Sequence, residues 1–415
     1  MSASVNEHYD ARETRDPEIR MREQLAQLRR QVAYAKERAQ AFTRLLADVD
    51  PDAITTPQAL ARLPVVRKSQ LADLQRASRP FGGLAADGAP IAQIFASPGG
   101  IYEPEGAVAD YWRLARALFA AGFRKGDLIH NAFAYHLTPA GSMLATGAHA
   151  LGCTVFPGGV GNTEQQLAAM TELRPDGYVG TPSFLRILLE RADEAGARID
   201  SVRRALVSAE PFPASLREQF AARGIEGYQV YATADLGSIA YESPARDGLV
   251  VDEGVLVEIV RPGTGEPVAD GDVGEVVVTQ LDNAAYPLIR FGTGDLSALL
   301  PGVSACGRTN RRIKGWMGRA DQTTKVKGMF VHPAQVDVIV KRHPEVKRAR
   351  LVVDNPQGAD RMILHVEATG MDPQLAEAIV ASIRDVTKLR GEVQFRAVDD
   401  LPKDGKVIDD LRKLE

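Results

Sequence analysis

Cysteine is scarce in this chain, and the two that it has, Cys153 and Cys306, lie far apart and outside any metal-binding spacing. Neither a disulfide framework nor a zinc ribbon is therefore indicated. No apolar run reaches the roughly 18 residues of a membrane span, and the amino terminus lacks the apolar core of a signal peptide. These absences predict a cytoplasmic protein without a membrane partner.

The chain also carries little net charge. Fifty basic and fifty-four acidic side chains leave a formal charge of -4, which does not favour a nucleic-acid partner. Its 415 residues are 45% hydrophobic. A chain of this size can bury several cores and is expected to divide into a large body and at least one smaller unit.

The amino-terminal region predicts helices. Apolar side chains recur at helical spacing over residues 17–46, and a second amphipathic helix is predicted within residues 55–74, with Ser69 as its N-cap. Neither segment carries obvious chemistry, so both are expected to cover a core.

From about residue 91 to residue 206, helical runs alternate with short apolar segments that end at glycine or proline. Such alternation is typical of βαβ units and a parallel sheet, and so of the α/β class. Examples are residues 127–131, 154–157 and 177–180. Over residues 224–297 the pattern changes to short strands separated by turns, which predicts an antiparallel or mixed β-rich part.

The last part of the chain follows a basic, glycine-containing stretch at residues 313–327. It shows two strand patterns at 350–353 and 362–367, a helix pattern at 373–387 and a further strand at 393–398. This composition predicts a small α+β domain. We place it at residues 319–415, after a body of residues 1–318.

Four segments in the same order resemble sequences of the phenylacetate-CoA ligase family of adenylate-forming enzymes. They lie at residues 9–15, 122–128, 159–165 and 179–183. Each segment alone is weak evidence, whereas their shared order makes coincidence improbable. The resemblance implies the adenylate-forming fold: a large body of several subdomains and a small, mobile carboxy-terminal domain. It also implies a homodimer, which nothing in the residue pattern supports independently.

Ser208-Ala-Glu-Pro211 is similar to the family's Gly-Ala-Glu-Pro loop, which lines the adenine pocket. The resemblance makes Ala209, Glu210 and Pro211 candidate adenine contacts. The alternative is an ordinary turn after a strand, because proline and small residues are common there.

Residues 228–237 resemble the family's Tyr-Gly-x-Thr-Glu segment. The resemblance implies that Tyr231 stacks on adenine and that Asp235 helps to hold Mg²⁺, although Ala234 occupies the usual threonine position. Mg²⁺ takes hard oxygen ligands, so aspartate suits the role. Glu242 is a second carboxylate nearby and a second metal candidate.

Phe291-Gly-Thr-Gly-Asp295 looks like the family's Tyr-Arg-Thr-Gly-Asp segment, which implies that Asp295 accepts hydrogen bonds from the ribose hydroxyls. Residues 318–328 resemble the hinge segment, with Arg319 at the ribose-contacting position and Asp321 at the hinge. The alternatives are a turn at the first segment and a solvated basic loop at the second.

Leu401-Pro-Lys-Asp-Gly-Lys406 resembles the terminal segment that bears the family's adenylation lysine. Lys406 follows the glycine as that lysine does. A cation there would neutralise charge that develops during acyl-adenylate formation. The alternative is a solvated lysine on a terminal tail.

The phosphate loop departs from the family pattern. Where the family has a Ser/Thr/Gly-rich loop ending in Gly-Lys-Pro, this chain has Phe-Ala-Ser-Pro-Gly-Gly-Ile-Tyr-Glu-Pro at residues 95–104. Ser97, Gly99 and Gly100 can offer hydroxyl and N–H donors to phosphate. Pro98 removes one N–H, Glu103 adds negative charge, and lysine is absent. A tight Pro-Gly-Gly turn explains the segment equally well.

The acyl pocket is expected near Tyr135, Gly158 and Gly159, which align with the family region that receives an aromatic acid. The glycines would leave room for a flat ring. Phe133 is better explained as plain core.

The function that the resemblance implies is an ATP- and Mg²⁺-dependent aryl- or arylacetyl-CoA ligase that acts through an acyl-adenylate, with an aromatic carboxylic acid, ATP and coenzyme A as small-molecule partners. One alternative is a family-derived protein that binds nucleotide or acyl ligand without ligase turnover. Another is an adenylate-forming transferase with an acceptor other than coenzyme A.

Overall fold

The computed structural model describes residues 7–97, 100–322, 324–326, 329–354, 360–368, 370, 372–402 and 406–412, except the side chains at 321, 325, 329 and 330. The chain forms two compact units. One contains Met1–Thr293 with Ala298–Trp316, and the other contains Gly294–Ser297 with Met317–Glu415. The longer segment of the second unit begins at Met317, two residues before the boundary expected from the sequence.

The first unit opens with a series of helices. They are η1 (Ala11–Thr14), α1 (Pro17–Arg38), α2 (Gln40–Leu45), η2 (Pro51–Ala53), α3 (Pro57–Leu60), η3 (Lys68–Gln70) and α4 (Leu71–Ala77). The single helix predicted over 17–46 is broken at Ala39, whose backbone is extended. The predicted N-cap at Ser69 is wrong, because Ser69 lies inside η3. The Gln70 side chain turns back to accept the N–H of Arg67.

A nine-stranded mixed sheet forms the centre of this unit, in the order β14-β15-β10-β9-β8-β7-β6-β4-β5. Its parallel strands are β4 (Leu128–Asn131), β5 (Thr154–Pro157), β6 (Gly177–Gly180), β7 (Arg204–Val207) and β8 (Glu226–Thr233). Its antiparallel strands are β9 (Gly237–Glu242), β10 (Leu249–Val251), β14 (Leu299–Leu300) and β15 (Arg312–Ile313). The predicted change from parallel to mixed sheet is confirmed.

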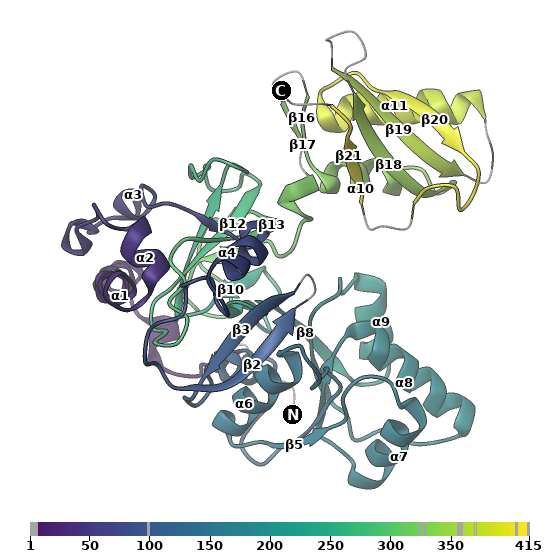
Figure 1. The fold of residues 1–415 in the computed structure, drawn as a ribbon. Helices are drawn as coiled ribbons and strands as arrows, with labels where there is room; N and C mark the ends of the chain where they lie inside the picture. Colours follow the sequence, from purple (N-terminus) through teal and green to yellow (C-terminus); the bar gives the residue numbers. More distant parts are fainter. Residues whose placement is uncertain are drawn as a thin grey trace. The chain divides into compact units, whose positions relative to one another are not determined.

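Helices cover both faces of the parallel strands, as Figure 1 shows for α6 and α8. Val179 and Leu206 pack in the cluster that contains α5 and α6, whereas Tyr178 and Ala205 pack with α7 and α8. Successive side chains of a strand point to opposite faces, which explains this division. The helices are α5 (Leu114–Ala120), α6 (Ala140–Leu151), α7 (Thr163–Leu173), α8 (Pro182–Ala195) and α9 (Ala214–Ala222).

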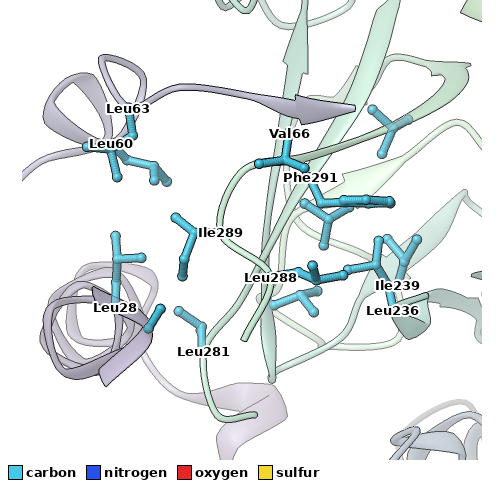
Figure 2. Packing of buried hydrophobic residues seen from close by; sticks show 14 of the residues in the cluster. Leu28, Leu60, Leu63, Val66, Leu236, Ile239, Leu281, Leu288, Ile289 and Phe291 are labelled. Carbon is cyan, nitrogen blue, oxygen red and sulfur yellow. The ribbon is translucent and has the colours of Figure 1, made fainter. Parts of the chain in front are cut away.

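A four-stranded sheet, in the order β1-β13-β12-β11, joins distant parts of the chain. Its strands are β1 (Val66–Arg67), β11 (Val255–Val260), β12 (Gly274–Gln280) and β13 (Phe291–Ser297), and a separate hairpin consists of β2 (Ile91–Ser97) and β3 (Ile101–Gly106). Figure 2 shows Leu28 of α1, Val66 and Leu236 in one buried cluster. This core therefore fixes β1 and the turn after β8 in the same unit.

The second unit has a four-stranded sheet in the order β20-β19-β18-β21 with two helices. Its elements are η4 (Ala320–Gln322), β16 (Thr324–Val326), β17 (Met329–Val331), α10 (Pro333–Lys341), β18 (Val346–Asp354), β19 (Arg361–Ala368), α11 (Pro373–Thr387), β20 (Glu392–Arg396) and β21 (Ile408–Asp410). The α+β composition matches the pattern of the sequence. No helix in the described ranges is long and apolar enough to cross a membrane.

Candidate active site

The carboxyl ends of the parallel strands gather most of the predicted residues of the first unit at one edge of the sheet. Gly158 follows β5, Ala209 follows β7 and Asp235 follows β8. Parallel strands bring their carboxyl ends to the same edge, where open α/β sheets bind ligands. The topology therefore places these residues on one rim although the chain separates them widely.

Two of the predicted acyl-pocket residues, Tyr135 and Gly159, contact Asn131, the last residue of β4. Its side-chain amide donates to the Tyr135 hydroxyl at 2.8 Å, and the Gly159 N–H donates to its backbone carbonyl at 3.0 Å. A side chain at Gly158 would collide with Gln166, whose Oε1 would lie 2.8 Å from the added Cβ. The glycine therefore allows Gln166 and His130 to pack closely against the backbone at this position.

His130 and Gln166 lie beside these residues and were not predicted. His130 Nε2 lies 2.7 Å from Gln166 Oε1, and Gln166 donates to the carbonyl of Gly159 at 2.9 Å. Burial lowers the pKa of His130 and raises that of Tyr135 to about 12, so both side chains are neutral near pH 7. The available signal was that His130 stands one residue before the end of a buried strand.

The candidate adenine contacts lie on β8 and on the loop that follows the neighbouring strand β7. Ala209, Glu210 and Pro211 are exposed on the loop after β7. The Ser208 hydroxyl donates to the carbonyl of Val230 at 2.8 Å and so ties this loop to β8. Tyr231, the next residue, donates its hydroxyl to Thr293 Oγ1 at 3.3 Å. Residues from three matching segments therefore lie close together.

The two metal candidates have different surroundings. Asp235 is 1% exposed, and its Oδ2 lies 2.6 Å from Lys68 Nζ, while its Oδ1 is buried without a hydrogen bond. Glu242 accepts from both terminal nitrogens of Arg217, at 3.0 and 3.2 Å, and from the N–H of Gln229 at 3.1 Å. Asp235 thus keeps an oxygen for a metal, whereas N–H donors already surround Glu242.

The phosphate-loop segment belongs to the β2–β3 hairpin, in which Ser97 pairs with Ile101. Gly100 adopts a φ of +74° that favours glycine, and Gly99 and Pro98 lie outside the described residues. Glu103 is fully buried rather than facing solvent, and burial raises its pKa to about 7. The Glu103 carboxyl, which we expected to add negative charge near the phosphates, therefore lies in the protein interior.

In the second unit, Arg319 Nη1 lies 3.1 Å from Asp295 Oδ1. A side chain at Gly294 would come within 2.8 Å of Arg319 Nη2, so the glycine makes room for this ion pair. The two predicted ribose-contacting residues are thus brought together by the fold.

The hinge and lysine segments also meet in the second unit. Asp321 lies in η4, and its side chain is outside the described part of the chain. The next residue, Gln322, accepts the Val407 N–H at 2.7 Å. Lys406 is exposed, and its Nζ lies 3.4 Å from Asp409 Oδ1. The described contacts therefore join the segment of the predicted hinge to that of the predicted catalytic lysine.

A cavity of about 670 Å³ lies elsewhere in the first unit, against α1 and β11. None of the described residues that line it is a predicted site residue. Its size alone does not make it the active site, because the residues with matching chemistry lie at the strand ends.

Comparison with known proteins defines the class first. Residues 132–284 match a family model described as AMP-binding enzyme. A crystal structure of 2-hydroxyisobutyryl-CoA ligase in an open conformation, with 2-HIB-AMP and CoA, gives a TM-score of 0.84 and covers 98% of this chain and 96% of that one. At 23% identity this likeness shows the fold alone, and it confirms the predicted adenylate-forming fold.

Curated relatives then define the family. This chain is 34% identical to a phenylacetate-coenzyme A ligase of Thermus thermophilus over 361 residues, which are 82% of this chain and 80% of the relative. It is 32% identical to a phenylacetate-coenzyme A ligase of Escherichia coli over 77% of this chain and 76% of that protein. The chain therefore belongs to the phenylacetate-CoA ligase family.

Proposed function

We propose that this protein is an ATP-dependent ligase that joins an aryl- or arylacetic acid to coenzyme A through an acyl-adenylate. The observation that carries the proposal is the 34% identity to a phenylacetate-coenzyme A ligase across about four fifths of both chains. The predicted site residues at the carboxyl ends of the parallel strands support the proposal, because their side chains are of the kinds that bind a nucleotide and a flat aromatic acid.

The proposed reaction has two steps. The carboxylate first attacks the α-phosphate of ATP and releases pyrophosphate, with Lys406 neutralising the developing charge. The thiol of coenzyme A then attacks the acyl carbon and releases AMP. Asp295 would accept hydrogen bonds from the ribose hydroxyls in both steps. Rotation of residues 319–415 about Asp321 would exchange the two arrangements.

Binding of the acid is assigned to the rim at Tyr135, Gly158 and Gly159. The neutral His130 and Tyr135 side chains suit a ring without charge of its own, and the space around Gly159 is open. Mg²⁺ is the implied metal, and Asp235 fits it because Oδ1 is buried without a hydrogen-bond donor. When bound, the ion would neutralise phosphate charge.

A second candidate is a ligand-binding relative without ligase turnover. The hairpin favours it, because residues 95–104 contain no lysine and their glutamate is buried. Incubation with ATP, Mg²⁺ and a panel of aromatic acids, with and without coenzyme A, separates the candidates when products are identified by mass spectrometry. Thioester formation supports the ligase, and acyl-adenylate alone supports a transferase with another acceptor. Calorimetric binding without any product supports the ligand-binding protein.

A further inference from the structure

The cavity of about 670 Å³ in the first unit lies apart from the strand ends and has a mainly apolar wall. Residues of α1, α3, β11 and β14 form much of this wall, among them Met21, Leu25, Leu60, Val255, Ile259 and Leu299. These side chains belong to or pack against the hydrophobic cluster that Figure 2 draws in part. A cavity of this size with an apolar wall and a few polar groups is typical of small-molecule sites.

A buried cation, Arg20, also lines the cavity and is 5% exposed. Its Nε lies 3.2 Å from Glu253 Oε1. Its Nη2 donates to the Arg12 carbonyl at 2.7 Å and to Asn310 Oδ1 at 3.2 Å, whereas its Nη1 is buried without a hydrogen bond. Native proteins pair nearly all buried polar atoms, so the two N–H donors of Nη1 indicate an absent acceptor.

The carboxylate nearest to Arg20 is already shared. Glu253 also accepts from Arg15 Nη2 at 2.5 Å and from Asn310 Nδ2 at 2.8 Å. The other carboxylate that pairs with Arg15, Glu23, is exposed. Two arginines therefore face a single buried carboxylate, which leaves positive charge at this wall.

The three carboxylates among the described residues of the wall each have another arginine as partner. The pairs are Asp252 with Arg113, Glu258 with Arg290 and Asp270 with Arg311, at 3.3, 2.9 and 2.6 Å. Asp252 Oδ2 also lacks a hydrogen bond, but burial raises the pKa of this carboxyl, which favours a proton on that oxygen. These groups therefore do not compensate the positive charge of Arg20.

Positive charge also exceeds negative charge beside the cavity. A neighbouring hollow of about 480 Å³ shares three residues of α1 with the cavity. Its wall adds Arg22, Arg29 and Glu18, and within the described ranges neither arginine forms an ion pair. An excess of cations favours an anion over a neutral or positively charged ligand.

We propose that this cavity binds a small monocarboxylic acid with an apolar body, whose carboxylate accepts from Arg20 and whose body contacts α1, α3 and β11. A guanidinium N–H and a carboxylate form a charge-assisted hydrogen bond, which is roughly twice as strong as a neutral one. The site is separate from the rim assigned to the acid substrate, and it does not depend on the proposed ligase activity.

The test is nuclear magnetic resonance of the full chain with ¹³C-labelled methionine methyl groups, titrated with octanoate in the absence of ATP and coenzyme A. Met21 lines the cavity, so its methyl signal reports binding there, and Met21→Leu identifies that signal by removing it. Octanoate is expected to shift the Met21 signal of the wild type saturably. Octanamide, which has the same apolar body without the charge, is expected to bind at least tenfold more weakly.

Arg20→Gln is expected to weaken octanoate binding at least tenfold, because the carboxylate loses its cation. Arg44→Gln, which changes an exposed arginine of α2, is the control and should bind like the wild type. Ala61→Phe gives an independent readout if Arg20→Gln does not fold. It adds a ring at the cavity wall and retains Arg20, so octanoate binding should again weaken at least tenfold.

The proposal is overturned if octanoate leaves the Met21 signal unchanged, if octanamide binds as tightly as octanoate, or if a folded Arg20→Gln or Ala61→Phe variant binds as the wild type does. A Met21 signal that shifts with protein concentration instead of octanoate would indicate a second copy of the chain at this face and would also overturn it. Pyrophosphate release without the Met21 shift would refute this site and leave the proposed function standing. The Met21 shift without any pyrophosphate release would do the reverse.

Discussion

Arg217 holds the carboxylate of Glu242 with two guanidinium nitrogens, at 3.0 and 3.2 Å. Glu242 is 6% exposed, so this ion pair is largely shielded from water. Glu242 is close in sequence to the metal candidate Asp235, but this ion pair gives its carboxylate a structural role rather than a metal-binding one.

Glu242→Gln is therefore expected to lower the free energy of unfolding by about 1–3 kcal/mol, because Arg217 loses its charged partner. The Mg²⁺ concentration that gives half-maximal activity should stay the same. Urea unfolding and an Mg²⁺ titration of activity measure the two effects. A large shift in the Mg²⁺ requirement at unchanged stability would return Glu242 to the metal site.

Glu13 provides a second test of stability. Its carboxylate accepts from the Tyr241 hydroxyl at 2.7 Å and lies 3.1 Å from both Arg116 and Arg308. Arg116 keeps its ion pair with Asp10, but Glu13→Ala leaves the buried Arg308 without an ion-pair partner among the described residues and should cost about 3–5 kcal/mol in urea unfolding. Glu37→Ala, which changes an exposed carboxylate of α1, should cost less than about 1 kcal/mol. Equal losses in the two variants would contradict the assignment.

Asp110 should make stability depend on pH. It accepts N–H donors from Leu114 at 2.8 Å and Ala115 at 3.2 Å, and burial raises its pKa from 3.8 to about 6. The native state therefore holds the proton more tightly than the unfolded chain. The resulting stabilisation is complete below about pH 4 and is lost as pH rises through about 6.

Asp110→Asn should consequently be more stable than the wild type above about pH 6.5, by up to about 3 kcal/mol, and equally stable below about pH 4. Urea unfolding of both proteins across this range measures the difference. A constant difference at every pH would show that the Asp110 carboxyl does not titrate as described.

Asp295→Asn tests the ribose assignment. A hydrogen bond to a charged group contributes about 1.5–3 kcal/mol, so KM for ATP should rise roughly 10- to 100-fold while KM for the acid changes little. Asp270→Asn, an exposed carboxylate that pairs with Arg311, is the matched control. Steady-state kinetics with each substrate varied in turn provide the measurement, and an unchanged KM for ATP would exclude the contact.

The sequence predicted those parts of the fold in which local pattern and packing agree. The bounds of β5 and α11 match the predicted ranges, because proline marks one end of each segment: β5 ends at Pro157 and α11 begins at Pro373. The long first helix was predicted unbroken because helical spacing continues through Ala39, although the backbone there turns to extended geometry.

The site was harder to predict wherever partners are distant in sequence. Lys68 stands 167 residues from Asp235, and no local pattern distinguishes it from other surface lysines. Glu103 was expected to add negative charge near the phosphates, and nothing in the local sequence indicated that its side chain is buried. Tertiary packing, which local sequence does not encode, determined both outcomes.

The central claim is that this protein forms an acyl-adenylate with the help of Lys406. The most direct measurement is pyrophosphate release from ATP and Mg²⁺ across a panel of aromatic acids, using the wild type and Lys406→Ala. We predict acid-dependent release by the wild type and its near-complete loss in Lys406→Ala at unchanged thermal stability. Folded wild-type protein that releases no pyrophosphate with any acid, or a Lys406→Ala variant as active as the wild type, would contradict this account.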